Sequence, residues 1–442
     1  DLQAAGVVNA RAKQQNMPFR IISKPNSNPA QREELTRLLM DWTVVVEKNK
    51  AETSYMQLLR VLQNRQYLKD DDSTANFFRT CTEICVERYL QEKTFNMVDS
   101  YAKLIVLLIK FSTPREQNSQ LLLLNKVLLI VAQVTVWQAD ECTKLVQAAL
   151  SAASGPATED QSVNIASKTF DQKPYFRLFV ALLEDLSVPD PALANGSSAD
   201  VVLQFANTFH ALRPQRIPGF AFAWMEMISH KCMVPALLSA RRSRMSGAMQ
   251  ILVVDLLQYM GPCLRKFDLN EATGMLYKGT LRFLLVLLHD YPEFFCDYHF
   301  NFCNNIPTNC IQLRNLVLSA FPRNMRLPDP FSPNLKIDQL PTIQQPPSMI
   351  SNHAKVLERY NLLKDIKPYL ETRQPASFLQ NVTKLVLLPP EQQVHTRFNV
   401  PVINALVLYT GAVASSSIGA SVERQAAVGL FMKLLRDLDN EG

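Results

Sequence analysis

Three residues with metal-binding side chains, Cys296, His299 and Cys303, are spaced by three and four positions, which would place them on one face of a helix. Thiolates and imidazoles in such a group are common ligands of zinc. However, structural zinc sites usually contain paired spacings such as Cys-x-x-Cys, and the three phenylalanines between residues 295 and 302 favour a hydrophobic core. We therefore predict that this cluster packs in the core and binds no metal.

Patterns typical of catalysis are missing from the sequence. It contains no GxSxG nucleophile elbow, no GxGxxG or GxxxxGK[ST] phosphate loop and no HExxH motif. The acidic triplet Asp70, Asp71 and Asp72 could hold the metal of a nuclease, but three carboxylates before Ser73 are more typical of a solvated turn that starts a helix. We predict that the chain is not an enzyme and needs no cofactor.

Arginines are the residues most suited to binding nucleic acid. A basic patch of this kind could hold the phosphates of RNA, although short arginine clusters more often contact the carbonyl groups at helix ends. The formal net charge of +6 and the pI of 8.8 are only mildly basic. Contact with RNA is therefore the secondary expectation. The candidate patch consists of Arg213, Arg216, Arg241, Arg242 and Arg244.

Residues 321–338 combine four prolines with six large apolar side chains. Proline prevents a continuous helix or a central strand, so the segment should be extended, yet it is too apolar for a solvated linker. We expect a Pro-rich strip that packs on the helices, either as an intramolecular clamp or as a surface for a partner. The candidate residues in this strip are Phe321, Arg323, Met325, Arg326, Leu327, Pro328, Pro330 and Phe331.

The elements that must carry these residues are helices. The chain has only 12 glycines, lacks Asn-Gly and Asp-Gly hairpin turns, and shows apolar residues at helical spacing. Helices are expected to start near residues 29, 73 and 116, a spacing of roughly 43–45 residues that is typical of HEAT and armadillo repeats. The sequence therefore predicts an all-α, HEAT-like helical-hairpin solenoid. Its expected subdomains are residues 1–150, 151–340 and 341–442.

Cysteine usage and hydropathy indicate the environment. The eight cysteines form no framework of closely spaced pairs, which favours free thiols in a reducing, intracellular compartment. The apolar run at residues 121–137 is interrupted by polar side chains and suits a buried helix better than a membrane span. The chain opens without a methionine or a signal peptide, so we expect it to be part of a longer protein.

Two segments carry a resemblance to a known family: "FHALRPQRIPGFAFAWMEMISH" (209–230) and the long stretch from "KGTLRFLLVLLHDYPEFFCDYHF" to "NLKID" (278–338). They closely resemble the C-terminal Not homology domain of the large scaffold subunit of the CCR-NOT mRNA deadenylase complex. Residues 29–208 are more weakly similar, residues 397–412 look like a further family segment, and residues 341–396 match poorly. The family domain continues beyond the position that matches residues 434–442.

The resemblance implies a HEAT-like platform without deadenylase activity of its own. Such a platform docks the Not-two and Not-three (or Not-five) subunits and recruits translational repressors of the Nanos type through short peptides. It would support mRNA deadenylation, translational repression and decay in the cytoplasm, including RNA granules, and in the nucleus. RNA would bind only weakly or indirectly, and we expect neither a membrane nor a small-molecule substrate. The alternative is an RNA-binding helical-repeat platform.

Overall fold

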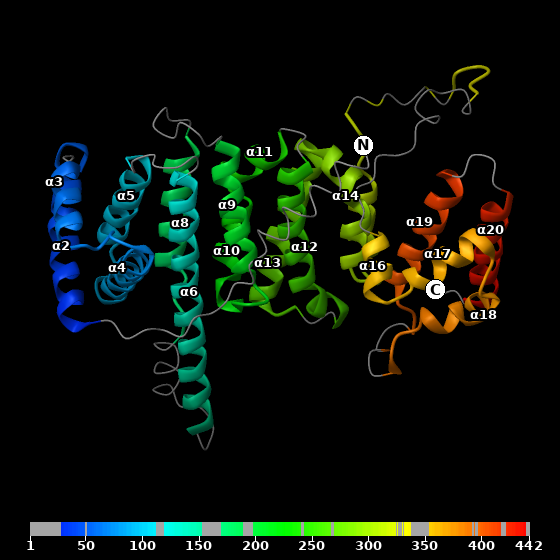
Figure 1. Ribbon diagram of the computed structural model, residues 1–442, viewed down its shortest axis with the longest axis horizontal. Helices are drawn as coiled ribbons and strands as arrows, with labels where there is room; N and C mark the ends of the chain where they lie inside the picture. Colours follow the sequence, from blue (N-terminus) through cyan, green and yellow to red (C-terminus); the bar gives the residue numbers. More distant parts are fainter. Residues whose placement is uncertain are drawn as a thin grey trace. The chain divides into compact units, whose positions relative to one another are not determined.

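The computed structural model confirms an all-α protein, and all regular elements of the described residues are helices apart from one isolated bridge between Leu387 and Phe398 (Figure 1). The structure describes residues 28–48, 51–111, 119–152, 169–188, 198–239, 243–266, 269–323, 325, 329, 331–336, 353–390, 393, 397–416 and 421–438. The chain forms two compact units, Asp1–Phe294 and Phe295–Gly442. The predicted boundaries near residues 150 and 340 fall beside or within residues that are not described, so they stay predictions.

The first unit is a stack of helices in which helices that are not consecutive in the chain pack side by side, as Figure 1 shows. For example, α5 packs on α8, α6 on α9, and α9 on α12. The helices are α2 (Pro29–Glu47), α3 (Ala51–Asn64), α4 (Asp71–Glu92), α5 (Asn96–Lys110), α6 (Ser119–Ala152), α8 (Lys173–Ser187), α9 (Ser198–Ala211), the short 3₁₀ turn η1 (Pro218–Phe220), α10 (Ala221–Ile228), α11 (Met233–Leu238), α12 (Ser243–Lys266) and α13 (Glu271–Asp290).

Helix starts in this unit follow the capping residues of the sequence. Asn28 accepts a hydrogen bond from the Ala30 amide and Pro29 is the first helical residue, as predicted. The next predicted start, near residue 73, lies two residues too late because Asp70 is the N-cap of α4 and accepts from the Ser73 amide at 2.7 Å. This hydrogen bond lowers the pKa of Asp70. The acidic triplet therefore starts a helix, which is the role that we favoured for it.

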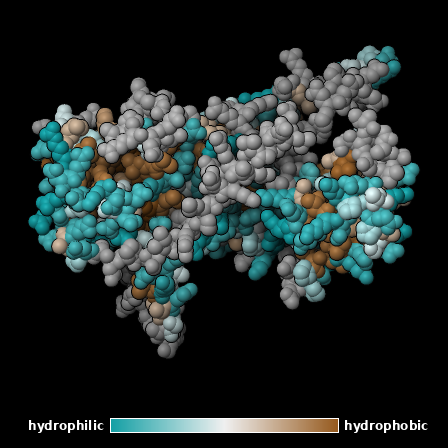
Figure 2. Space-filling model, in the orientation of Figure 1, coloured by the Kyte–Doolittle hydropathy of each residue, from teal (hydrophilic) through white to brown (hydrophobic). Residues whose placement is uncertain are grey.

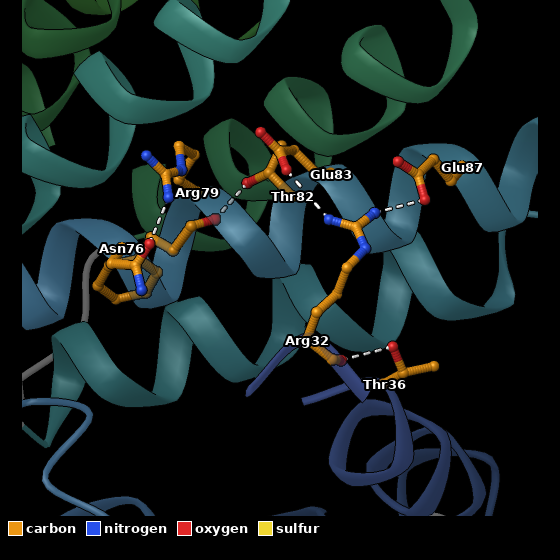
Figure 3. A network of polar contacts seen from close by, with 8 residues as sticks. Arg32, Thr36, Asn76, Arg79, Thr82, Glu83 and Glu87 are labelled. Atoms are coloured by element: carbon orange, nitrogen blue, oxygen red, sulfur yellow. Dashed lines mark hydrogen bonds and ion pairs between the residues drawn. The ribbon is translucent and has the colours of Figure 1, made fainter. Parts of the chain in front are cut away.

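Buried aromatic residues and one polar network connect the helices of the first unit. The indole N–H of Trp42 donates to the Ser100 carbonyl at 2.8 Å and joins α2 to α5. Figure 3 shows a second connection, in which Arg32 of α2 pairs with Glu83 at 3.1 Å and with Glu87, both on α4. Hydrophobic burial supplies most of the stability, and these polar contacts fix how α2 lies on its neighbours.

Two helices of the first unit, Ser119–Ala149 and Arg244–Lys266, are long and apolar enough to cross a membrane by length and composition alone. In each of them about half of the most apolar window is buried inside the protein. Such burial is typical of a core helix. It agrees with the expectation that the run at residues 121–137 is a buried helix.

The second unit is a smaller helical layer with its own core. Helix α16 packs on α19, and α17 packs on α20. Leu357, Ile366, Phe378, Leu406 and Leu430 contribute to one hydrophobic cluster, to which α14 adds Phe300. The helices are α14 (Pro292–Asn305), which begins just before this unit, α15 (Ile311–Leu318), α16 (His353–Arg359), α17 (Leu363–Thr372), α18 (Ala376–Leu385), α19 (Val400–Ser416) and α20 (Ser421–Asp437).

Candidate functional site

The candidate site is a pocket of about 490 Å³ in the second unit, where α14, α15 and α19 meet. Its volume lies in the range of roughly 300–1,000 Å³ that is usual for ligand-binding pockets. All three helices present residues spaced by one turn, so each contributes one face. The lining residues are His299, Phe300, Cys303 and Asn304 of α14, Ile311, Arg314, Asn315 and Leu318 of α15, and Asn404, Val407 and Leu408 of α19.

Helix α15 is apolar on two sides, and only one of them is covered. Leu313 and Val317 are buried and hold the helix on the protein. On the pocket side, Ile311 and Leu318 remain 62% and 59% exposed, and Val407 of α19 is 40% exposed. Single exposed apolar residues are common on soluble proteins, whereas several that share one pocket are typical of an interaction site.

The polar groups of the pocket could fix the orientation of a bound chain. The Asn404 Nδ2 amide donates to Asn304 Oδ1 at 2.9 Å, which ties α19 to α14. This bond leaves the Asn304 amino group and the Asn404 carbonyl oxygen for other partners. Arg314 also lines the pocket, and no carboxylate of the described residues pairs with its guanidinium group. The pocket therefore offers apolar walls together with hydrogen-bonding groups and one cation.

Hydrophobic surface occurs in both units, each considered by itself. Figure 2 shows brown patches over α5 and α8 of the first unit, and others around α19 in the second. The pocket combines such a surface with a concave shape and polar groups. This combination makes the pocket a candidate for a specific contact.

Comparison with known proteins decides the family. Residues 182–442, which include the whole pocket, match the family model described as CCR4-Not complex component, Not1. The chain belongs to the Not1 family. It is 31% identical over 423 residues to the CCR4-NOT transcription complex subunit let-711 of Caenorhabditis elegans, covering 88% of this chain and 15% of that protein. It is 28% identical over 335 residues to the general negative regulator of transcription subunit 1 of Schizosaccharomyces pombe, covering 74% of this chain and 14% of that protein.

Solved structures share the fold of this Not1-family chain. The NOT1 superfamily homology domain from Chaetomium thermophilum matches with a TM-score of 0.73 and 21% identity, over 96% of this chain and 80% of that one. A Not1 C-terminal domain in complex with Not4 matches with a TM-score of 0.69 and 21% identity, over 93% and 81% of the two chains. These likenesses confirm the helical solenoid fold, and the family match confirms the predicted resemblance.

The Cys-His cluster of this Not1-family chain lies on α14, as its spacing predicts, but only part of its surroundings is core. Phe295 and Phe302 are fully buried against each other, with ring centroids 5.5 Å apart. Cys296, His299 and Cys303 are all half-buried, and the last two line the pocket, so the prediction that this cluster packs in the core is wrong. His299 Nδ1 donates to the Cys296 carbonyl at 2.8 Å. Among the described residues, no three His, Cys, Asp or Glu side chains are close enough to hold a metal ion.

The Pro-rich strip differs from its prediction at its aromatic residues. Phe331 is 90% exposed and Phe321 is also exposed, so neither packs on the helices as a buried anchor. Met325 is half-buried and Arg323 is exposed. A clamp built on Phe331 is therefore wrong, because an exposed ring contributes little burial energy. The remaining candidates of the strip, Arg326, Leu327, Pro328 and Pro330, lie outside the described residues.

The basic patch is not a continuous set of free cations. The Arg213 guanidinium donates to the His210 carbonyl near the end of α9 at 3.0 Å, which is the helix-end contact that we preferred for these arginines. Arg216 pairs with Asp140 of α6 at 3.1 Å. Arg244 is exposed, and Arg241 and Arg242 lie outside the described residues. Two of the five arginines are therefore already bound to protein acceptors.

The pocket itself was missed by sequence reasoning. Its walls come from residues 299–318 and 404–408, which are far apart in the chain, and helical periodicity does not say which helices meet. One local signal was present. Ile311 and Leu318 stand seven residues apart on the side of α15 opposite to Leu313 and Val317, so the helix carries more apolar surface than one core contact requires.

Proposed function

We propose that this chain is a non-catalytic protein-interaction scaffold within the CCR4-NOT complex. It docks the Not-two and Not-three or Not-five type subunits, and it receives peptide motifs of Nanos-type translational repressors. In this role it supports mRNA deadenylation, translational repression and mRNA decay. The proposed locations are the cytoplasm, including RNA granules, and the nucleus. The observation that carries the proposal is the match of residues 182–442 to the Not1 family.

The chemistry of the pocket supports binding rather than catalysis. Burial raises the pKa of the Cys303 thiol, and the positive charge of Arg314 offsets only part of this effect. A raised pKa disfavours the thiolate, which is the reactive form of cysteine. His299 donates a hydrogen bond through Nδ1 to the Cys296 carbonyl. The raised pKa of Cys303 thus disfavours the thiolate that covalent catalysis by cysteine needs.

The curated relatives are much longer than this chain, which spans 15% or less of the two named above. The activity of the whole complex is therefore not assigned to this segment. One solved structure of the same fold is a Not1 C-terminal domain in complex with Not4. That finding belongs to the relative, and it supports the proposal that this kind of helical surface serves as a docking platform.

The rival function is an RNA-binding platform, and salt dependence separates the two. Binding to RNA phosphates weakens steeply as salt rises, because counterions are released, whereas contacts between apolar surfaces do not. We would measure binding of a fluorescein-labelled short poly(A) RNA and of a purified Not-two and Not-three type pair, at about 0.15 M salt and at a higher salt concentration. The proposal expects subunit binding to persist while RNA binding is weak and disappears. Tight RNA binding in physiological salt would favour the rival.

A direct activity test addresses the non-catalytic part of the proposal. The purified chain would be incubated with poly(A) and magnesium or manganese, the ions used by metal-dependent nucleases. No shortening of the RNA is expected. Shortening that depends on the metal and is lost after chelation would contradict a scaffold without catalytic activity.

A further inference from the structure

The charge of the pocket is one-sided. Of the eleven described residues that line it, Arg314 carries the permanent charge and none is acidic. No carboxylate of the described residues pairs with its guanidinium group, although the side chain is half-buried. A half-buried guanidinium gains most from a carboxylate, which it can bind through two parallel hydrogen bonds. The charge of the pocket is therefore complementary to an acidic ligand.

The apolar groups stand on both sides of this cation. Arg314 follows Ile311 by three residues and precedes Leu318 by four, so it lies about one helical turn from each of them along the same face of α15. Val407 adds apolar surface from α19. A ligand that covers this face must therefore present an acidic group between two apolar groups.

The hydrogen-bonding groups favour a peptide as the source of those features. The Asn304 amino group and the Asn404 carbonyl oxygen remain available after the bond between the two side chains. Asn315 adds another amide with no side-chain partner among the described residues. Donors and acceptors that line one pocket match the alternating N–H and C=O groups of a peptide backbone.

We propose that the pocket between α14, α15 and α19 binds a short segment of a partner protein in which an aspartate or glutamate lies between two large apolar residues. The carboxylate pairs with Arg314, the apolar side chains cover Ile311, Leu318 and Val407, and the backbone bonds to the asparagine amides. This inference rests on the proposed scaffold function and specifies the chemistry of one docking site. It requires no change in the covalent structure of either partner.

The test starts with a displayed library of random short peptides that is selected on the full chain. Enriched peptides are synthesised with a fluorescein label, and their Kd values are measured by fluorescence anisotropy. We expect an acidic residue flanked by leucine, isoleucine or an aromatic residue in the enriched sequences. Enriched peptides without an acidic residue would overturn the proposal.

Variants locate the peptide on the protein. Arg314→Glu should weaken binding about tenfold or more, since it replaces a charge pair with a repulsion. Arg359→Glu is the matched control, because Arg359 is an exposed arginine of α16 that does not line the pocket, and it should change the Kd little. Leu318→Ser should also weaken binding. Equal losses for Arg314→Glu and Arg359→Glu would show a non-specific charge effect and overturn the site.

Exchanging the charges of Arg314 and of the peptide's acidic residue tests whether the two groups contact each other directly. A peptide whose acidic residue is replaced by lysine should bind poorly to the natural protein and at least several-fold better to the Arg314→Glu variant. Failure of this exchange would contradict a direct pair. Arg314→Gln, compared by thermal melting with the natural protein, provides a milder variant should the glutamate disturb α15.

Assembly with Not-two and Not-three type subunits is measured on the same preparations. Assembly without peptide binding to the pocket would overturn this inference and leave the proposed scaffold function intact. Peptide binding that depends on Arg314 without assembly would overturn the proposed partners and leave the pocket intact. The two claims can thus fail independently.

Discussion

Replacing Phe331 with alanine should hardly change the free energy of unfolding of the second unit. The ring is 90% exposed, so it buries about one tenth of its surface. A fully covered aromatic side chain buries on the order of 150–250 Å². One tenth of that area is about 20 Å² and contributes about 0.5 kcal/mol at ~25 cal/mol per Å². This value is far below the loss expected for a buried anchor.

Phe378→Ala is the matched control in the same unit. Phe378 is buried in the hydrophobic cluster of the second unit and lies 5.2 Å from the Tyr369 ring, measured between centroids. Truncation of such a residue typically costs about 3–5 kcal/mol, because burial energy is lost and a cavity remains. The comparison keeps the chemistry of the substitution constant and changes only the burial.

Urea denaturation followed by circular dichroism measures both variants. Since the two units can unfold in separate transitions, the transition of the second unit is the one that Phe378→Ala shifts. A loss of about 2 kcal/mol or more for Phe331→Ala would be well above the energy expected from the buried area of its ring. Such a loss would contradict an exposed Phe331 and favour the intramolecular clamp. If Phe331→Ala instead preserves stability but weakens subunit assembly, the ring acts as an interface residue, as hot-spot anchors do.

Three further outcomes test other parts of the structure. Arg32→Ala removes the pairs with Glu83 and Glu87 and should cost about 1.5–3 kcal/mol in urea denaturation; an unchanged midpoint would contradict their role in holding α2 on α4. Burial lowers the pKa of His230 in the folded protein, whereas an unfolded chain has the ordinary histidine pKa of about 6.5. The unfolded chain therefore binds the proton more readily, and the free energy of unfolding falls as the pH drops below about 6.5. His230→Gln should therefore reduce the loss of melting temperature between neutral and mildly acidic pH, and an unchanged loss would contradict this role of His230. Elemental analysis of the purified chain should find only substoichiometric zinc, and one tightly held equivalent would contradict the metal-free prediction for Cys296, His299 and Cys303.

The helical fold was predictable because its determinants are local. Helix starts depend on capping residues and helix faces on apolar spacing, both of which can be seen in one short segment. Pro29 and Asn28 predicted the start of α2 at the correct residue. At α4 the prediction was late because a serine cap was assumed, whereas the aspartate three residues earlier caps the helix by accepting from the Ser73 amide.

The site was less predictable because it depends on which helices meet. His299 and Cys303 share a helix face by their spacing, but that spacing could not show that the face borders a pocket completed by α19, about a hundred residues later. Phe331 illustrates the opposite error. Its apolar neighbours indicated docking, yet composition does not specify the surface to dock on, and the ring is exposed.

Docking of CCR4-NOT subunits on this chain can be measured from the mass of the assembly. The chain of 50.0 kDa would be mixed with purified Not-two and Not-three type subunits and passed over a size-exclusion column with light-scattering detection. We expect one species that contains all three proteins, has a mass equal to their sum and stays intact when the salt concentration is raised. Elution of the chain at its own mass, separate from both subunits, would show that it is not a docking scaffold for them.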